Sequence, residues 1–159
     1  MYPDYINSHS SAPGWDAVVA ISSILEHIPA LPQPIAGSLR QVVDVVSGII
    51  RTVNLMRQNR NDCAHLISRV VRFLQSLVDD LRTSKVPILD GTPTTARLFA
   101  LRSNLMAIKE DTERWSRLGA LGSFVKSGEI KDAISRHREN LVDCFSTFQV
   151  SACLTLSFS

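Results

Sequence analysis

Apolar residues recur at three- and four-residue spacing over most of the chain, which is the period of an amphipathic helix. The longest such pattern runs from residue 123 to residue 153. Its inward positions are Ile130, Ile134, His137, Leu141, Cys144, Phe145, Phe148 and Ala152. Ser127 or Gly128 can cap this helix, and Glu129 stands in its first turn, where a carboxylate is favoured. We expect this helix to be the element around which the rest of the chain is organised.

A proline-rich break separates the first two helical patterns. The first helix follows Pro13 and Gly14, and its apolar side chains cover more than half of the helix circumference. Such a helix is either well buried or available to something apolar outside the domain. Three Pro within residues 28–34 must end it, because proline cannot continue a helix. Pro34 suits the first turn of a second helix, which extends to about residue 58.

Two further helices precede the last one. Residues 58–62 form a polar corner, after which apolar positions at helical spacing continue to about residue 82. Residues 85–95 contain two Pro and an Asp-Gly turn signal, and they predict one long loop. The fourth helix has a near-heptad apolar spacing, which favours nearly antiparallel packing in a bundle. Two Gly within residues 118–123 indicate a bend before the last helix.

The C-terminal residues allow two interpretations. From Phe148 onward apolar and polar residues alternate, which is the period of a strand, whereas residues 141, 145, 148 and 152 fit a helix. We expect the helix to continue to about Leu154. If this end is exposed, it is a hazard for aggregation or oligomerisation.

These patterns predict an all-α fold: an up-and-down four-helix bundle with an additional helix, about five helical segments in all. We expect residues 1–12 to be a disordered tail and residues 13–153 to form the bundle domain. Residues 154–159 are expected to be a C-terminal tail or the start of a linker.

The composition narrows the class of protein. Hydrophobic residues make up 45% of the 159 residues and charged residues 20%, which is typical of one globular domain with its own core. A net charge of +2 is too small to imply a nucleic-acid partner. Three Cys, an odd number, favour free thiols in a reducing compartment. With no secretory signal and no long apolar run, we expect a soluble cytoplasmic protein.

The sequence offers little catalytic chemistry. It contains no Gly-rich phosphate loop, no His-Glu-x-x-His and no Cys-x-x-Cys. His137 and Cys144 share a helix face, which could suggest a base and a nucleophile, but a core-edge His and a buried inert Cys explain them better. Glu110, Asp111 and Glu113 form an acidic cluster that a solvated helix face explains. We therefore expect no enzymatic activity, no cofactor and no metal.

Basic residues gather near the corner at 58–62 and the bend at 118–123, which could lie at the same end of an up-and-down bundle. A basic end would attract anionic lipid headgroups, whereas the alternative is scattered charge that keeps the protein soluble. The candidate lipid-binding residues are Arg51, Arg57, Arg60, Arg114, Arg117 and Lys126.

Three segments carry a resemblance to a known family: VVAISSILEHIPALPQPIAG, LMRQNRNDCAHLISRVVRFL and FVKSGEIKDAISRHRENLVDCFSTFQVS. Their shared features are a proline-broken corner before Pro-Ile-x-Gly, the pattern Asn-Arg-x-x-Cys-x-x-Leu, and Phe-x-x-x-x-Glu-Ile-Lys at the last helix. Over about residues 15–152 the chain resembles fungal N-terminal helical domains. Those domains are similar to HeLo-type domains and to the four-helix bundle of the mixed-lineage kinase domain-like pseudokinase.

The resemblance implies an effector or adaptor module that usually precedes a kinase-like, nucleotide-binding or repeat region. In the killer members the bundle self-associates, binds anionic phospholipid through basic residues and disrupts the membrane. In other members it is a signalling contact. The present sequence departs from this pattern because it carries no appended catalytic or sensor domain, so it is either a fragment or a stand-alone form.

Two functional hypotheses follow. In the first, the chain is a cell-death or innate-immunity bundle that self-associates, is recruited from the cytoplasm and binds or permeabilises anionic membranes. Its first helix is then a mobile or membrane-inserting element. The apolar residues of that helix are Val18, Val19, Ile21, Ile24, Leu25 and Ile28. The alternative for this helix is an ordinary place in the core. In the second hypothesis the chain is an adaptor that docks a partner helix through Phe148, Val150 and Leu154. Kinase-like or nucleotide-binding signalling proteins are the partners that the resemblance implies.

Overall fold

The predicted all-α bundle is confirmed by a computed structural model, which describes residues 15–83 and 92–157, without the side chains of residues 15, 92 and 149–157. Within these residues the chain forms six α-helices, one 3₁₀ helix and no strand. The elements are α1 (Trp15–His27), η1 (Ile28–Ala30), α2 (Ile35–Leu55), α3 (Arg60–Thr83), α4 (Thr92–Ser116), α5 (Ala120–Val125) and α6 (Ser127–Ser157). The expected N-terminal tail and most of the expected long loop lie outside the described residues.

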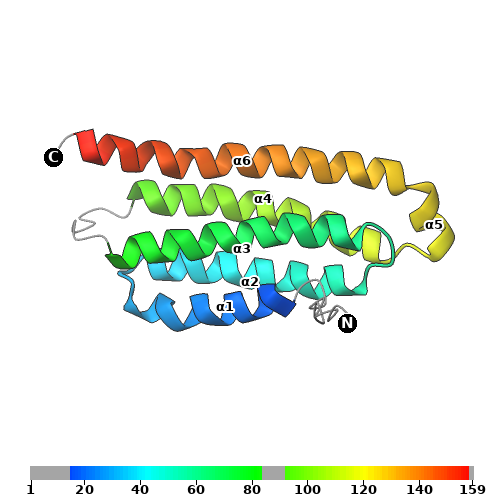
Figure 1. Ribbon diagram of the computed structural model, residues 1–159, viewed down its shortest axis with the longest axis horizontal. Helices are drawn as coiled ribbons and strands as arrows, with labels where there is room; N and C mark the ends of the chain where they lie inside the picture. The colour runs from blue at the N-terminus through cyan, green and yellow to red at the C-terminus, as the bar shows by residue number, and fades with distance from the viewer. Residues whose placement is uncertain (1–14, 84–91, 158–159) are drawn as a thin grey trace, which may run out of the picture.

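The four long helices α2, α3, α4 and α6 lie side by side along one axis (Figure 1). Around the bundle, α2 contacts α3 and α4, and α6 closes the ring against the same two helices. Although α4 follows α3 in the chain, these two helices lie across the diagonal. The most extensive contact between two helices is that of α2 with α4. These two helices run in the same direction, whereas α4 and α6 are antiparallel (Figure 1).

The central helix is α2 rather than the last helix, contrary to the expectation from the sequence. Ten residues of α2 are buried, against seven in α3, and α2 contacts α1, α3 and α4. Its contact with α4 is close because Gly48 has no side chain: a Cβ there would lie 3.1 Å from Cε of Lys109. The expected inward positions of α4 and α6 are largely correct, since Leu98, Leu105 and Leu141 are all buried.

The first helix, α1, packs on the outside of α2 and α3 (Figure 1). Some of the apolar residues predicted for this helix are buried in the core and others are exposed on the surface. Ile21, Ile24 and Ile28 are buried. Val18, Val19 and Leu25 are exposed. Release of α1 together with η1, to which Ile28 belongs, would expose all three isoleucines. Each of them stabilises the fold by about 1.5–3 kcal/mol when fully buried. This arrangement matches the alternative of a core helix for one face of α1.

Several element boundaries differ from the sequence prediction. The second helix ends at Leu55, and the residues before Arg60 form a tight corner with Asn59 at a φ of 58°. Asn tolerates this left-handed conformation better than other residues with a side chain. The expected bend at 118–123 overlaps the short helix α5, which the sequence did not predict. At the C-terminal end, α6 continues to Ser157, so the helical interpretation of these residues is confirmed and the strand is not observed there.

Replacing Ile24 with Ala tests whether α1 belongs to the core. Ile24 is 2% exposed, so we expect Ile24→Ala to lower the free energy of unfolding by about 2–4 kcal/mol. The matched control is Val19→Ala, which removes a side chain that is 55% exposed and should change stability by less than about 0.5 kcal/mol. Urea denaturation followed by circular dichroism measures both. Equally small effects would mean that α1 is not packed in solution.

Candidate functional site

One end of the bundle brings together two regions of the chain that are far apart in the sequence. The corner between α2 and α3, the end of α4, the short helix α5 and the start of α6 all lie there (Figure 1). Asn59 links two of them, because its Nδ2 donates a hydrogen bond to Oγ of Ser127 at 3.5 Å. The corner at 58–62 and the bend at 118–123 therefore do lie at the same end, which we call the α5 end.

All six candidate lipid-binding residues belong to two stretches that contain no acidic residue, residues 45–61 and 114–128. Three of them follow helix ends at the α5 end: Arg57 two residues after α2, Arg117 directly after α4 and Lys126 directly after α5. A cation is favoured there because the last carbonyl groups of a helix carry partial negative charge. Arg57, Arg117 and Lys126 are exposed, and among the described residues no acidic side chain pairs with them.

The other three candidates are placed differently. Arg114 is exposed but forms an ion pair with Asp111, three residues earlier on α4. Arg60 is partly buried, and its Nε has no hydrogen-bond partner among the described residues. Arg51 is exposed one turn before α2 ends. The structure thus brings the six residues to one region of the bundle. Arg114 is already paired and Arg60 is partly buried, so not all six are accessible to an external anion.

Exposed apolar side chains also gather at the α5 end. Of the large apolar side chains that the structure describes, the four most exposed are Leu55 (73%), Leu121 (78%), Phe124 (71%) and Val125 (73%). Leu55 is the last residue of α2, and the other three belong to α5. Sequence reasoning missed the α5 residues because the two Gly suggested a bend. The missed signal is that residues 121, 124 and 125 have the spacing of one helix face.

The short helix is held by its opposite face. Gly119 precedes α5 in an extended conformation, and Ser123 is 4% exposed. The Ser123 hydroxyl donates a hydrogen bond to the carbonyl oxygen of Leu118 at 3.4 Å, which satisfies it. Because Ser123 faces the protein, Leu121, Phe124 and Val125 face away from it.

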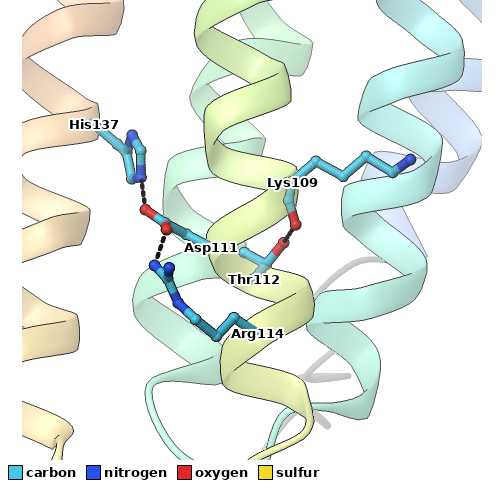
Figure 2. Close-up of polar contacts among 5 residues, drawn as sticks. All are labelled: Lys109, Asp111, Thr112, Arg114 and His137. Atoms are coloured by element: carbon cyan, nitrogen blue, oxygen red, sulfur yellow. Dashed lines mark hydrogen bonds and ion pairs between the residues drawn. The ribbon is translucent and has the colours of Figure 1, made fainter.

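A polar bridge joins α4 to α6 (Figure 2). Nε2 of His137 lies 2.6 Å from Oδ2 of Asp111, and the same carboxylate pairs with Arg114. The side chains of His137 and Asp111 are only 12% and 22% exposed. The expectation that the acidic cluster is a solvated face is therefore wrong for Asp111, which contacts a neighbouring helix.

The suggested pairing of Cys144 with His137 is not observed, because the His137 ring contacts Asp111 instead. Burial raises the pKa of the Cys144 thiol, although a hydrogen bond with Asn104 opposes this effect. Burial and the nearby Asp62 carboxylate raise the pKa of Cys63 to about 12. Both shifts disfavour the thiolate, which is the reactive form. The arrangement supports the interpretation of these cysteines as inert core residues.

The partner-contact candidates are only partly described. The ring of Phe148 packs edge-on against Phe73 at a centroid distance of 5.1 Å, and Phe145 stacks on the same ring at 4.1 Å. Phe148 thus takes part in packing between α3 and α6. Val150 and Leu154 belong to α6, but their side chains lie outside the described residues.

Other features of the described residues offer no competing site. An open cavity of about 440 Å³ lies between α1 and α3, lined by Ser23, His27, Arg72, Gln75 and Asp79 among others. It combines a guanidinium group and an imidazole ring with a carboxylate, and it points to no particular ligand. The described part of the chain has no group of three His, Cys, Asp or Glu side chains placed to hold a metal ion. None of its helices combines the length and the apolar character needed to cross a bilayer.

No family model matches the chain, and neither a curated protein nor a solved structure matches it significantly.

The raised pKa of Cys63 predicts a loss of stability at alkaline pH. The thiol ionises at its ordinary value of 9.0 in the unfolded chain but only near 12 in the folded one. As pH rises, the unfolded state loses this proton first, so stability is intact below about pH 9 and declines between those two values. We expect the stability advantage of the wild type over Cys63→Ala to shrink from about pH 8 to about pH 11. A constant difference in urea denaturation would contradict this explanation.

The contact between His137 and Asp111 should be measurable as a coupling free energy. We expect Asp111→Ala and His137→Ala each to destabilise the protein by about 1–2 kcal/mol, because the remaining partner is left partly buried. The double variant should be less destabilised than the sum of the two, by about 0.5–1.5 kcal/mol. A double-mutant cycle by chemical denaturation gives this coupling, and strict additivity would show that the bridge does not hold α6 to α4.

Proposed function

We propose that the chain is a non-enzymatic signalling bundle that binds anionic membranes through its α5 end. The observation that carries this proposal is the meeting of two acid-free basic stretches, residues 45–61 and 114–128, at one end of the bundle. Arg57, Arg117 and Lys126 are exposed there without acidic partners among the described residues. Clustered cations of this kind fit the phosphate and carboxylate groups of anionic lipids better than they fit a neutral surface.

The magnitude of this attraction favours self-association on the membrane. Each Lys or Arg close to an anionic surface contributes about 1 kcal/mol, so three cations supply about 3 kcal/mol and bind a single bundle only weakly. Several bundles joined together would add their contributions and bind far more tightly. A protein that self-associates on activation could therefore move from the cytoplasm to a membrane without any change in the lipid-binding residues.

Acidic residues border the two basic stretches and reduce the local charge without cancelling it. Asp62 and Glu129 lie in the first turns of α3 and α6. Carboxylates at these positions are favoured by the partial positive charge of a helix N-terminus, so they compensate the helix dipoles in part. The cations that follow the C-terminal ends of α2 and α4 stay accessible to an external anion.

The resemblance to HeLo-type and related bundles supports a more specific role in cell death or innate immunity, with membrane disruption after oligomerisation. Kinase-like or nucleotide-binding signalling proteins would then control the bundle. In this role, release of α1 would have to overcome the burial of Ile21, Ile24 and Ile28. The adaptor alternative has less support, because Phe148 packs against Phe73 rather than projecting free from α6.

Charge reversal tests the lipid-binding end. We expect Arg57→Glu, Arg117→Glu and Lys126→Glu together to abolish co-sedimentation with phosphatidylcholine–phosphatidylserine vesicles. Wild-type binding should require phosphatidylserine and weaken with salt, because salt screens exposed charges. Dye release from the same vesicles tests membrane disruption.

The matched control reverses three cations at the opposite end of the bundle, Arg40, Arg82 and Arg97, with the same change in net charge. It should bind as the wild type does. Each reversal at a helix C-terminus costs about 0.3–1 kcal/mol, so circular dichroism must first show that both triple variants are folded. Equal binding by wild type and both variants would refute the proposed lipid site.

A further inference from the structure

The apolar side chains of α5 have no role in the bundle core. Leu121, Phe124 and Val125 are all more than 70% exposed, and so is Leu55 at the same end of the bundle. Every other large apolar side chain that the structure describes is at most 65% exposed. Scattered apolar residues are normal on protein surfaces, but a group of this kind at one end indicates an interaction site. The fold does not require these side chains, because the buried Ser123 face is what contacts the protein.

The charges around α5 indicate which partner covers this group. Arg117 precedes the helix, Lys126 follows it directly, and the whole stretch 114–128 contains no acidic residue. An apolar face flanked by cations and free of carboxylates matches the anionic interface of a bilayer, with its charged headgroups above an apolar interior. The position of α5 fits as well, since it lies at the extreme end of the long axis of the bundle (Figure 1).

We infer that α5 enters the interfacial layer of an anionic bilayer, with Leu121, Phe124 and Val125 below the headgroups and Arg117 and Lys126 among them. Leu55 lies at the same end and adds to the apolar contact. The bundle then stands upright on the membrane. This inference rests on the proposed function and adds to it an inserting element, a depth and an orientation. The inserting element is α5 rather than α1.

Upright insertion has a geometric consequence that can be measured. With 31 residues at 1.5 Å each, α6 extends about 46 Å along the bundle axis. Side chains in the first two turns of α4, Phe99 among them, belong to the half of the bundle that lies farther from α5 (Figure 1). They should therefore stay in water when α5 is inserted. Insertion of α1 lengthwise would instead lay the bundle flat.

Tryptophan fluorescence at position 124 tests the insertion. We expect the emission that Phe124→Trp adds to that of the parent to shift to the blue on phosphatidylcholine–phosphatidylserine vesicles. Brominated acyl chains should quench it. The matched control is Phe99→Trp, at a position that is 65% exposed, whose added emission should change little. Both substitutions replace an exposed aromatic residue, so neither should disturb the fold.

A second variant separates insertion from charge attraction. Leu121→Ser with Phe124→Ser keeps every cation, so it should still bind anionic vesicles at low salt. At high salt, where charge attraction is screened, we expect its bound fraction to be at least about tenfold lower than that of the wild type. The control Val19→Ser with Phe99→Ser should bind as the wild type does at both salt concentrations.

The outcomes distinguish a failure of this inference from a failure of the proposed function. Binding that charge reversal abolishes, with no quenching at position 124 and no effect of the serine variants, would overturn insertion and leave the lipid site standing. No binding of the wild type to phosphatidylcholine–phosphatidylserine vesicles would overturn both. A blue shift of Phe124→Trp in solution, together with dimer formation and no vesicle binding, would assign the α5 face to a second copy of the chain and overturn the inference.

Discussion

The apolar surface of α2 is wider than one neighbouring helix can cover, and the arrangement of the other helices follows from this. Ten of its residues are buried, including the adjacent pairs Val45–Val46 and Ile49–Ile50, which point in different directions around the helix. α1 with η1, α3 and α4 each cover part of this surface. The absence of a side chain at Gly48 lets the stem of Lys109 lie across α2, so that α4 packs closely. α6 closes the ring against α3 and α4 and keeps its outer face in water.

Because the core extends along the bundle axis, packing constrains the residues at the two ends of the bundle less than those in the middle. Within α5 itself Ser123 is the buried residue, so most side chains of this short helix are not needed for folding. Cations at the ends of α2 and α4 are also compatible with the helix dipoles. The exposed Leu121 and Phe124 stabilise nothing in the described structure. Their presence is therefore better explained by an interaction than by the fold.

The sequence predicts the inward faces well because helical periodicity is local. Leu98, Leu101 and Leu105 are buried as their spacing indicates. Periodicity identifies a face but not the helix that covers it, so the pairing of α2 with α4 and the contact between Asp111 and His137, 26 residues apart, could not be foreseen. The basic candidates were found because charge runs are visible in sequence, while the ion pair of Arg114 depends on its surroundings. α5 was missed because each Gly lowers helix propensity by about 1 kcal/mol.

The pairing of α2 with α4 also determines the order in which the chain can fold. These helices are separated in sequence by the whole of α3, so their contacts are non-local and their loop-closure entropy must be overcome before the contacts form. A chain that ends after Thr83 could pair α2 with α3 but would leave the α4-facing side of α2 in water. We therefore expect that the first half of the protein does not fold on its own. During synthesis, that side of α2 stays uncovered until α4 has been made.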